Sequence, residues 1–66
     1  MNEKTKLIAL LLSYIEQEIT VKQLRDALAK IKPGYETNRL LNQINSTNGA
    51  EAIQSFVTDA LSDLVN

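Results

Sequence analysis

Residues 19–49, ITVKQLRDALAKIKPGYETNRLLNQINSTNG, decide the fold. Apolar side chains recur there at helical spacing on both sides of Pro33 and Gly34. The proline disfavours helix at the residue before it, and the glycine is expected to take positive φ in the turn. This pattern predicts two helices, at 20–31 and at 35–45, joined by a tight turn.

Capping signals mark two of the helix starts. Thr20 and Gln23 match a capping box, in which each side chain satisfies a backbone N–H group of the other residue. Asn48 and Glu51 are expected to form a second box, after a turn rich in Asn, Ser and Thr. A helix is predicted to follow at 50–65. Its apolar stripe has the helical period and consists of Ala50, Ile53, Phe56, Val57, Ala60, Leu61, Leu64 and Val65.

A further helix is predicted at 4–18, and it is apolar over much of its circumference. Its broad apolar face consists of Leu7, Ile8, Leu11, Leu12, Ile15 and Ile19. Leu10 and Tyr14 lie four residues apart on an adjoining face. A solvent-facing helix of a small domain does not normally carry so much apolar surface. The helix is therefore either central in the fold or shared with a partner.

These segments together predict an all-α fold, a compact bundle of about four helices that forms a single domain over 1–66. No stretch alternates with a period of two residues, so no strands are expected. The predicted core consists of Leu7, Ile8, Leu11, Ile15, Leu24, Leu28, Leu41, Ile44, Ile53, Val57, Ala60 and Leu64.

Composition argues against several classes of function. The 66 residues include no Cys and no His, so we expect no disulfide, no metal site and no histidine base. The two glycines stand apart, which is unlike a phosphate-binding loop. Asp59 and Asp63 share one helix face, where a solvated pair is favoured over a catalytic one. We predict a binding protein that is not an enzyme and uses no cofactor and no small-molecule substrate.

The apolar run at 7–12 does not indicate a membrane protein. It is six residues long, whereas a membrane-spanning helix needs about 20. Glu16 and Glu18 follow it closely, and no small-residue cleavage site of a signal peptide is seen. A cytoplasmic protein without a membrane partner is expected.

The net charge of −1 conceals an uneven distribution. Residues 20–45 carry five basic and two acidic side chains, whereas residues 46–66 carry three acidic side chains and no basic one. The middle of the chain is therefore basic, with enough charge for a small phosphate-contacting face, and the last helix is acidic. The same charges are also within the normal range of a solvated surface.

The stretch 19–49 resembles the helix-turn-helix of bacterial DNA-binding regulators, including winged-helix proteins. In those proteins a capped helix, a short turn and a second helix with a polar start follow one another, as they do here. The resemblance implies that 20–31 is the positioning helix and 35–45 the recognition helix in a DNA major groove. The chain departs from a winged helix because helical sequence, and not a strand, follows Gly49.

That resemblance implies a set of side chains that contact duplex DNA through base edges and phosphates. The predicted nucleic-acid-binding residues are Lys22, Lys32, Thr37, Asn38, Arg39, Asn42 and Gln43. A homodimer is expected as well, because apolar residues of the last helix fall at heptad positions. The predicted interface consists of Leu10, Tyr14, Ile53, Phe56, Val57, Leu61 and Leu64.

A second function stays open beside DNA-binding regulation. The chain also fits a helical protein–protein interaction module, an inhibitor or adaptor that binds a partner protein through an apolar face. Residues 36–64 resemble two helices of a caspase-recruitment domain of the death fold. The similar features are an Arg-Leu-Leu run, a glycine before a helix and an Ala-x-x-x-Phe spacing. Such domains have six helices, more than this sequence predicts.

Overall fold

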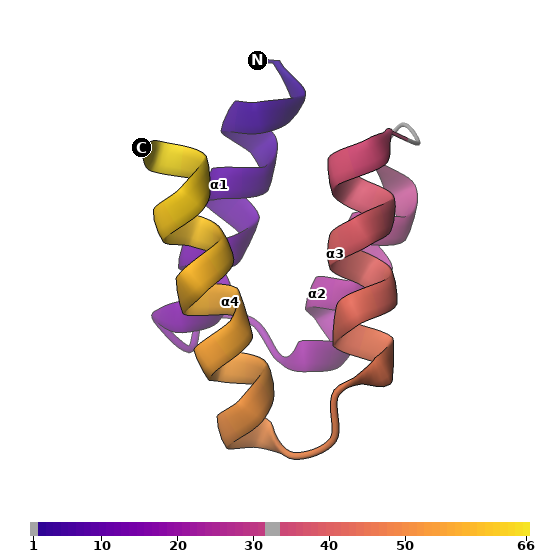
Figure 1. Ribbon diagram of the computed structural model, residues 1–66, viewed down its shortest axis with the longest axis vertical. Coiled ribbons are helices and arrows are strands. Elements are labelled where there is room, and N and C mark those ends of the chain that lie inside the picture. The colour runs from indigo at the N-terminus through magenta and orange to yellow at the C-terminus, as the bar shows by residue number, and fades with distance from the viewer. Residues whose placement is uncertain (1, 32–33) are drawn as a thin grey trace.

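Four α-helices make up the computed structural model, which describes residues 2–31 and 34–66. They are α1 (Glu3–Ile15), α2 (Val21–Lys30), α3 (Tyr35–Ser46) and α4 (Ala50–Val65). Successive helices run in opposite directions, and the two termini lie at the same end of the bundle (Figure 1). The bundle measures 30 × 20 × 20 Å, and the described residues form no strand. The prediction of a compact all-α bundle is confirmed.

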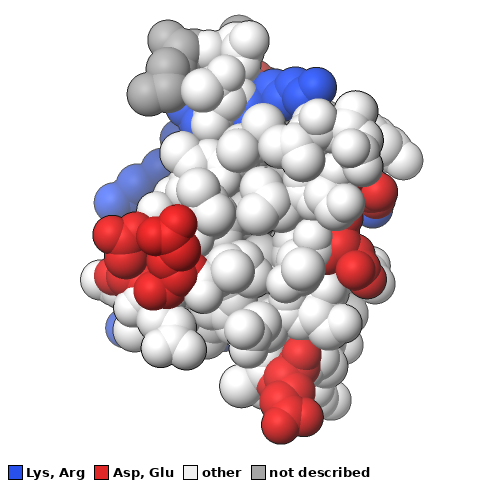
Figure 2. Space-filling model, turned by 90° about the vertical axis from the view of Figure 1, so that its left-hand side faces the viewer, with Lys and Arg blue, Asp and Glu red and all other residues white. Residues whose placement is uncertain are grey.

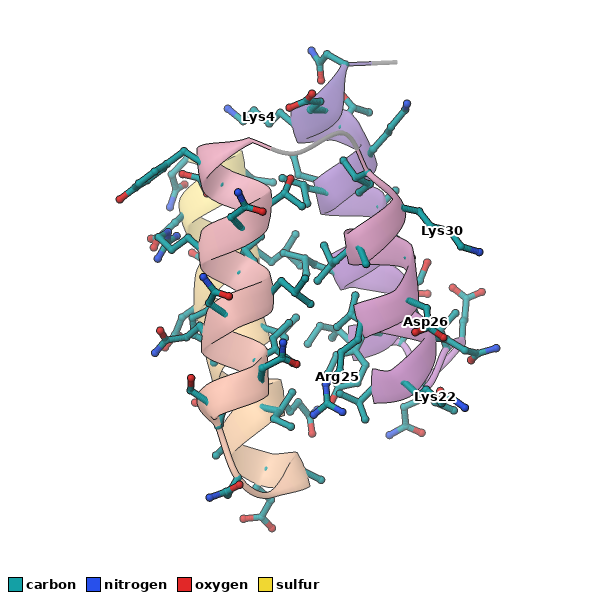
Figure 3. The ribbon with its side chains drawn as sticks, turned by 90° about the vertical axis from the view of Figure 1, so that its right-hand side faces the viewer. Lys4, Lys22, Arg25, Asp26 and Lys30 are labelled. Atoms are coloured by element: carbon teal, nitrogen blue, oxygen red, sulfur yellow. The ribbon has the colours of Figure 1, made fainter. Side chains whose placement is uncertain are left out.

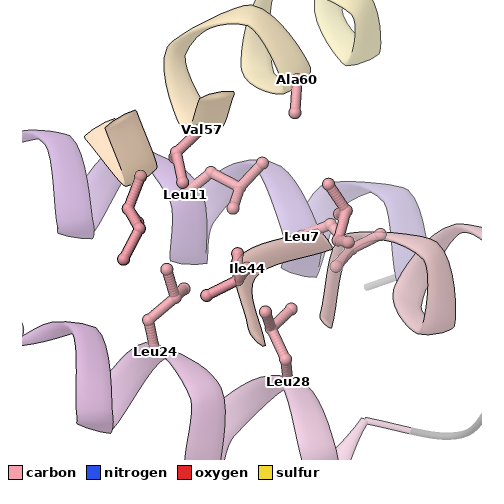
Figure 4. Packing of buried hydrophobic residues seen from close by; sticks show 9 residues of the cluster. Leu7, Leu11, Leu24, Leu28, Ile44, Val57 and Ala60 are labelled. Carbon is pink, nitrogen blue, oxygen red and sulfur yellow. The ribbon is translucent and has the colours of Figure 1, made fainter. Parts of the chain in front are cut away.

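The helices follow one another around the bundle, so that α1 pairs with α2 and α4, and α3 pairs with α2 and α4 (Figure 1). The pairing of α1 with α4 is the most extensive of these contacts. Each helix turns a stripe of apolar side chains toward one shared core, where they interdigitate (Figure 4). The core residues are Leu7, Leu11, Leu24, Leu28, Leu40, Ile44, Ile53, Val57 and Ala60.

Eight of the twelve predicted core residues are buried in the core, and the other four are only half-buried. Leu40 is fully buried, whereas its neighbour Leu41, which the prediction placed in the core, is half-buried at the edge. The two residues are one helical step apart, so the sequence pattern of α3 does not separate them, and packing decides. Three further predicted core residues are half-buried: Ile15 and Leu64, which pack against the core, and Ile8.

Helix α1 ends at Ile15, three residues before the predicted end at 18. Gln17 adopts the left-handed conformation with a φ of 63°. The N–H of Glu18 donates to the carbonyl of Ser13 at 2.9 Å, and the N–H of Gln17 donates to that of Tyr14 at 3.0 Å. This is the Schellman pattern that closes a helix, in which glycine is the usual left-handed residue. Because this position holds a glutamine and not a glycine, the sequence does not indicate that the helix ends here.

The helix starts agree only partly with the predicted caps. The Thr20–Gln23 capping box is present, with both hydrogen bonds formed at 3.1 Å and 2.8 Å. The second predicted box is wrong, because Gly49 is the N-cap of α4 and no side chain caps that helix. Gly49 has a φ of 94°, a conformation that favours glycine.

The turn between α2 and α3 includes Lys32 and Pro33, which lie outside the described residues. Gly34 follows as the N-cap of α3, with a φ of −155° and a ψ of 168°. The expectation of positive φ at this glycine is therefore wrong, since the backbone is extended. A Cβ atom at Gly34 would lie 3.3 Å from a carboxylate oxygen of Glu3, the end of an exposed side chain that can move aside.

Replacing Gln17 with glycine is expected to stabilise the fold. The change removes the steric cost of a left-handed non-glycine residue, and this gain exceeds the added chain entropy, for a net increase of about 0.5–1 kcal/mol in the free energy of unfolding. Urea denaturation followed by circular dichroism measures it. The control is Glu18→Gly, at the neighbouring residue with negative φ, which should lower stability; equal effects of the two changes would contradict the capping argument.

Leu11 and Leu12 form a matched pair for testing the core, because Leu11 is 0% exposed and Leu12 is 43% exposed. Leu11→Ala should cost about 2–5 kcal/mol through lost burial and a cavity. A domain this small rarely has more than about 3–5 kcal/mol of net stability, so this variant should be largely unfolded. Leu12→Ala should cost less than about 1 kcal/mol. Circular dichroism melts at low micromolar concentration compare them, and similar melts would contradict the assigned core.

Candidate functional site

One flank of α1 and the neighbouring flank of α4 form a surface that is apolar and accessible. On α1, Ile8, Leu12 and Ile15 follow one another at helical spacing beside the buried stripe. On α4, Leu61 and Val65 are four residues apart on the flank that periodicity turns toward α1. We call these five residues the α1–α4 face. Leu12 and Val65 are 43% and 61% exposed, and the other three are half-buried.

Charged groups surround the α1–α4 face but leave its centre free. Figure 2 shows this side of the molecule, with an uncharged central area flanked by acidic atoms. Thr58 is exposed on α4, and its hydroxyl donates to the carbonyl of Gln54 at 2.9 Å, so it is satisfied within the helix. Basic atoms lie at the upper edge of this side and acidic atoms at the lower edge (Figure 2). An apolar centre within a charged rim is the usual anatomy of a protein interface.

The outward side of α3 is polar and differs in character from the α1–α4 face. Asn38, Arg39, Asn42 and Gln43 are all exposed on this helix. Tyr35 is 80% exposed at its first turn. Arg39 has an exposed ion pair with Glu36 at 3.6 Å, which offsets its charge. The helix therefore presents hydrogen-bonding groups and an accessible ring, with little net charge.

The predicted nucleic-acid-binding residues do not all lie on one surface. Thr37 is 3% exposed, so its side chain lies inside the protein and not on the outer side of α3. Lys32 lies outside the described residues. Lys22 is exposed on α2, on the same stripe as Lys30, and Asp26 lies between the two lysines (Figure 3). The basic surface of α2 is thus interrupted by an acidic side chain.

Arg25 lies between the two lysines of α2 in sequence, and it is half-buried. Its side chain is directed toward α3 (Figure 3). Its Nε atom is buried without a hydrogen-bond partner among the described residues. The aliphatic stem of an arginine packs on apolar surface as a Met side chain does. Arg25 therefore contributes packing, at the cost of one unsatisfied donor.

The predicted interface residues divide between the core and separate flanks. Ile53 and Val57 are part of the chain's own core, so the heptad stripe of α4 is used within the chain. Leu10 and Tyr14 pack against the core on the flank of α1 that faces away from Leu12, as helical spacing places them. Phe56, Leu61 and Leu64 are half-buried as well, and Leu61 alone of the predicted set belongs to the α1–α4 face.

Sequence reasoning missed Leu12, Val65 and Tyr35 as exposed apolar groups. Leu12 and Val65 were assigned to the apolar stripes of their helices, and each is at the edge of its stripe. The available signal was the excess of apolar residues on α1, which a bundle of this size does not enclose on all sides.

A hollow at the end of the bundle near the termini is lined by Glu3, Lys4, Leu7, Glu36, Asp63 and Leu64. Within 2–31 and 34–66, no three acidic side chains are grouped so as to hold a metal ion. None of the helices described has the length and apolar character needed to cross a membrane.

Comparisons with protein families, with curated proteins and with solved structures find no match for the chain. The surfaces of the bundle are therefore the basis for any statement about its function.

Replacement of Arg25 by Met is expected to leave the free energy of unfolding unchanged within about 1 kcal/mol, or to raise it. The change removes a buried donor that has no partner and keeps an apolar stem of similar length. Arg25→Ala should be destabilising, because it removes the stem too. Chemical denaturation of the three proteins tests this, and a large loss of stability in Arg25→Met would show that the guanidinium has a partner.

Proposed function

We propose that this chain is a small protein-interaction domain that binds another protein surface through the α1–α4 face. The observation that carries the proposal is the row of apolar residues in that face, with Leu12 43% exposed and Val65 61% exposed around an uncharged centre. Contact with a partner removes such surface from water, at roughly 25 cal/mol per Å² of apolar area. The function is binding and involves no catalytic step.

The composition supports this proposal from another direction. A chain of 66 residues without cysteine has a small core, and small folds are often stabilised by association. Helix α1 carries more apolar residues than the bundle buries, and the surplus faces outward at Ile8 and Leu12. Association through α1 would bury this surplus apolar surface, which the isolated bundle leaves accessible to water.

Nucleic-acid binding through the outer side of α3 is a second candidate function. It is favoured by the exposure of Asn38, Arg39 and Asn42, whose side chains suit base edges and phosphates. We rank it second for two reasons. Arg39 is paired with Glu36, and α2 and α3 lie antiparallel side by side (Figures 1 and 3), whereas helix-turn-helix pairs cross at roughly 90–120°. The helix-turn-helix resemblance itself stays a prediction.

A photo-reactive amino acid in place of Leu12 tests the proposed function directly. Irradiation in cells that produce the protein should yield a covalent adduct, because position 12 lies within the contact. The same group in place of Asn42, on α3, is the matched control and should yield little adduct. Intact-mass spectrometry reports what is attached. Adducts at position 42 but not at 12 would contradict the proposal.

The matching substitution is Leu12→Asp, which places a charge in the α1–α4 face without altering the core. It should weaken partner binding by at least about tenfold. Asn42→Asp adds the same charge on α3 and should have no effect. Circular dichroism checks that both variants keep the wild-type fold.

Fluorescence anisotropy with a random duplex of about 30 base pairs tests the second candidate. Phosphate contacts would give binding at about 50 mM salt that weakens steeply as salt rises. Arg39→Ala should then reduce the affinity, whereas Leu12→Asp should not. Absence of binding at low salt would remove the second candidate and leave the first unaffected.

A further inference from the structure

Four residues form a continuous stripe along α1, with a charge of opposite sign at each end. Lys4, Ile8, Leu12 and Glu16 follow one another at intervals of four residues, so they form one oblique row, which advances about 40° around the helix axis at each step. Lys4 is exposed in the first turn, and Glu16 is exposed at the C-cap. Ile8 and Leu12 between them belong to the α1–α4 face. The stripe thus reads basic, apolar, apolar, acidic.

The stripe is complementary to the same stripe of a second copy that runs in the opposite direction. Two copies of α1 placed side by side in antiparallel orientation bring Lys4 of each against Glu16 of the other. In the same register, Ile8 of each meets Leu12 of the other. A contact in which residue i meets j and j meets i is the signature of a two-fold symmetric interface. Parallel orientation would instead place like charges together at both ends.

We propose that the α1–α4 face is covered by a second copy of this chain, with the two α1 helices antiparallel and related by a two-fold axis. The inference rests on the proposed function, for which it names the partner. The axis crosses α1 midway between Ile8 and Leu12, so each copy contributes both apolar residues to the centre and one charge to each of the two ion pairs.

The upper and lower edges of this side of the molecule differ in the sign of their charge. Basic atoms lie at its upper edge, and acidic atoms lie at its lower edge and on both sides of its centre (Figure 2). A two-fold axis that lies across the face brings the upper edge of each copy onto the lower edge of the other. Asp59 and Asp63 lie on the flank of α4 that periodicity turns away from α1, outside the centre of the contact.

The unpartnered state of the end charges also supports association. Among the described residues the ion pair within 4.0 Å is that of Arg39 with Glu36, so neither Lys4 nor Glu16 has a salt-bridge partner at that distance, and Lys4 shares the hollow with Glu3, Glu36 and Asp63. Both charges also oppose the dipole of their own helix, which favours acidic groups at its start and basic groups at its end. In the antiparallel pair, each charge instead meets an opposite charge, and the two helix dipoles oppose each other.

Charge reversal gives a sharp test by analytical ultracentrifugation at low salt. The wild-type chain should form dimers, and Lys4→Glu and Glu16→Lys should each raise the dissociation constant by roughly tenfold or more, because each reversal creates two like-charge contacts. An equimolar mixture of the two variants should form a heterodimer, since both of its end contacts then join opposite charges. The double variant, with both reversals in one chain, should dimerise within about threefold of wild type.

The design separates loss of association from loss of folding. Glu16→Lys places a charge in agreement with the helix dipole, so its monomer should be at least as stable as wild type. Lys4→Glu adds a carboxylate to the hollow that Glu3, Glu36 and Asp63 line, so its monomer should lose some stability. Circular dichroism checks this. Raised salt should weaken the wild-type dimer and narrow the differences among the variants.

Two outcomes would overturn the inference, and they have different meanings for the proposed function. A wild-type chain that stays monomeric up to about 1 mM excludes the second copy as partner. The proposed function then survives if the photo-reactive group at position 12 attaches a different protein. A dimer that is abolished by Leu12→Asp but unaffected by either charge reversal overturns the antiparallel register while it leaves the α1–α4 face in use.

Discussion

The packing of Leu11, Leu24 and Leu40 at the centre of the bundle is the contact on which the rest of the structure depends. These side chains come from three helices, and each is fully buried. With no cysteine in the chain, burial of apolar surface is the main source of stability. Each helix contributes only two or three core residues, so no helix has a core without the others. A fold of this kind forms all at once or not at all.

The small core also explains why apolar surface is left over. A bundle of four short helices encloses one stripe of each helix, whereas α1 carries apolar residues on its stripe and on both flanks. The flank with Leu10 and Tyr14 packs against the edge of the core. The flank with Ile8 and Leu12 has no second layer of helices to cover it. The candidate interface is thus a consequence of core size combined with the composition of one helix.

Periodicity was sufficient to predict the helices but not how they meet. The helix at 50–65 was predicted to the residue, because a glycine-containing turn precedes it and its stripe is unbroken. The end of α1 was predicted three residues too late, since Gln17 takes the left-handed conformation that glycine usually adopts. In α3, Leu40 and Leu41 differ by one helical step, and only contact with the other helices identifies the buried one.

Prediction of the candidate sites was limited in the same way, because the sequence does not show how the helices meet. Polar character predicted correctly that the amide side chains of α3 are exposed, because nothing in a small core pairs with them. Thr37 was assigned to the DNA-contacting set, but its side chain is buried on the inner side of α3. The α1–α4 face escaped prediction because it belongs to two helices that are far apart in the sequence.

Both ends of the chain lie at the same end of the bundle (Figure 1). Within one copy, any segments attached before α1 and after α4 would leave from neighbouring points. In the antiparallel pair that we propose, the termini of the second copy point the opposite way. The pair would then act as a short rigid spacer. It would keep the segments joined to one copy about 30 Å, the length of one bundle, from the segments joined to the other.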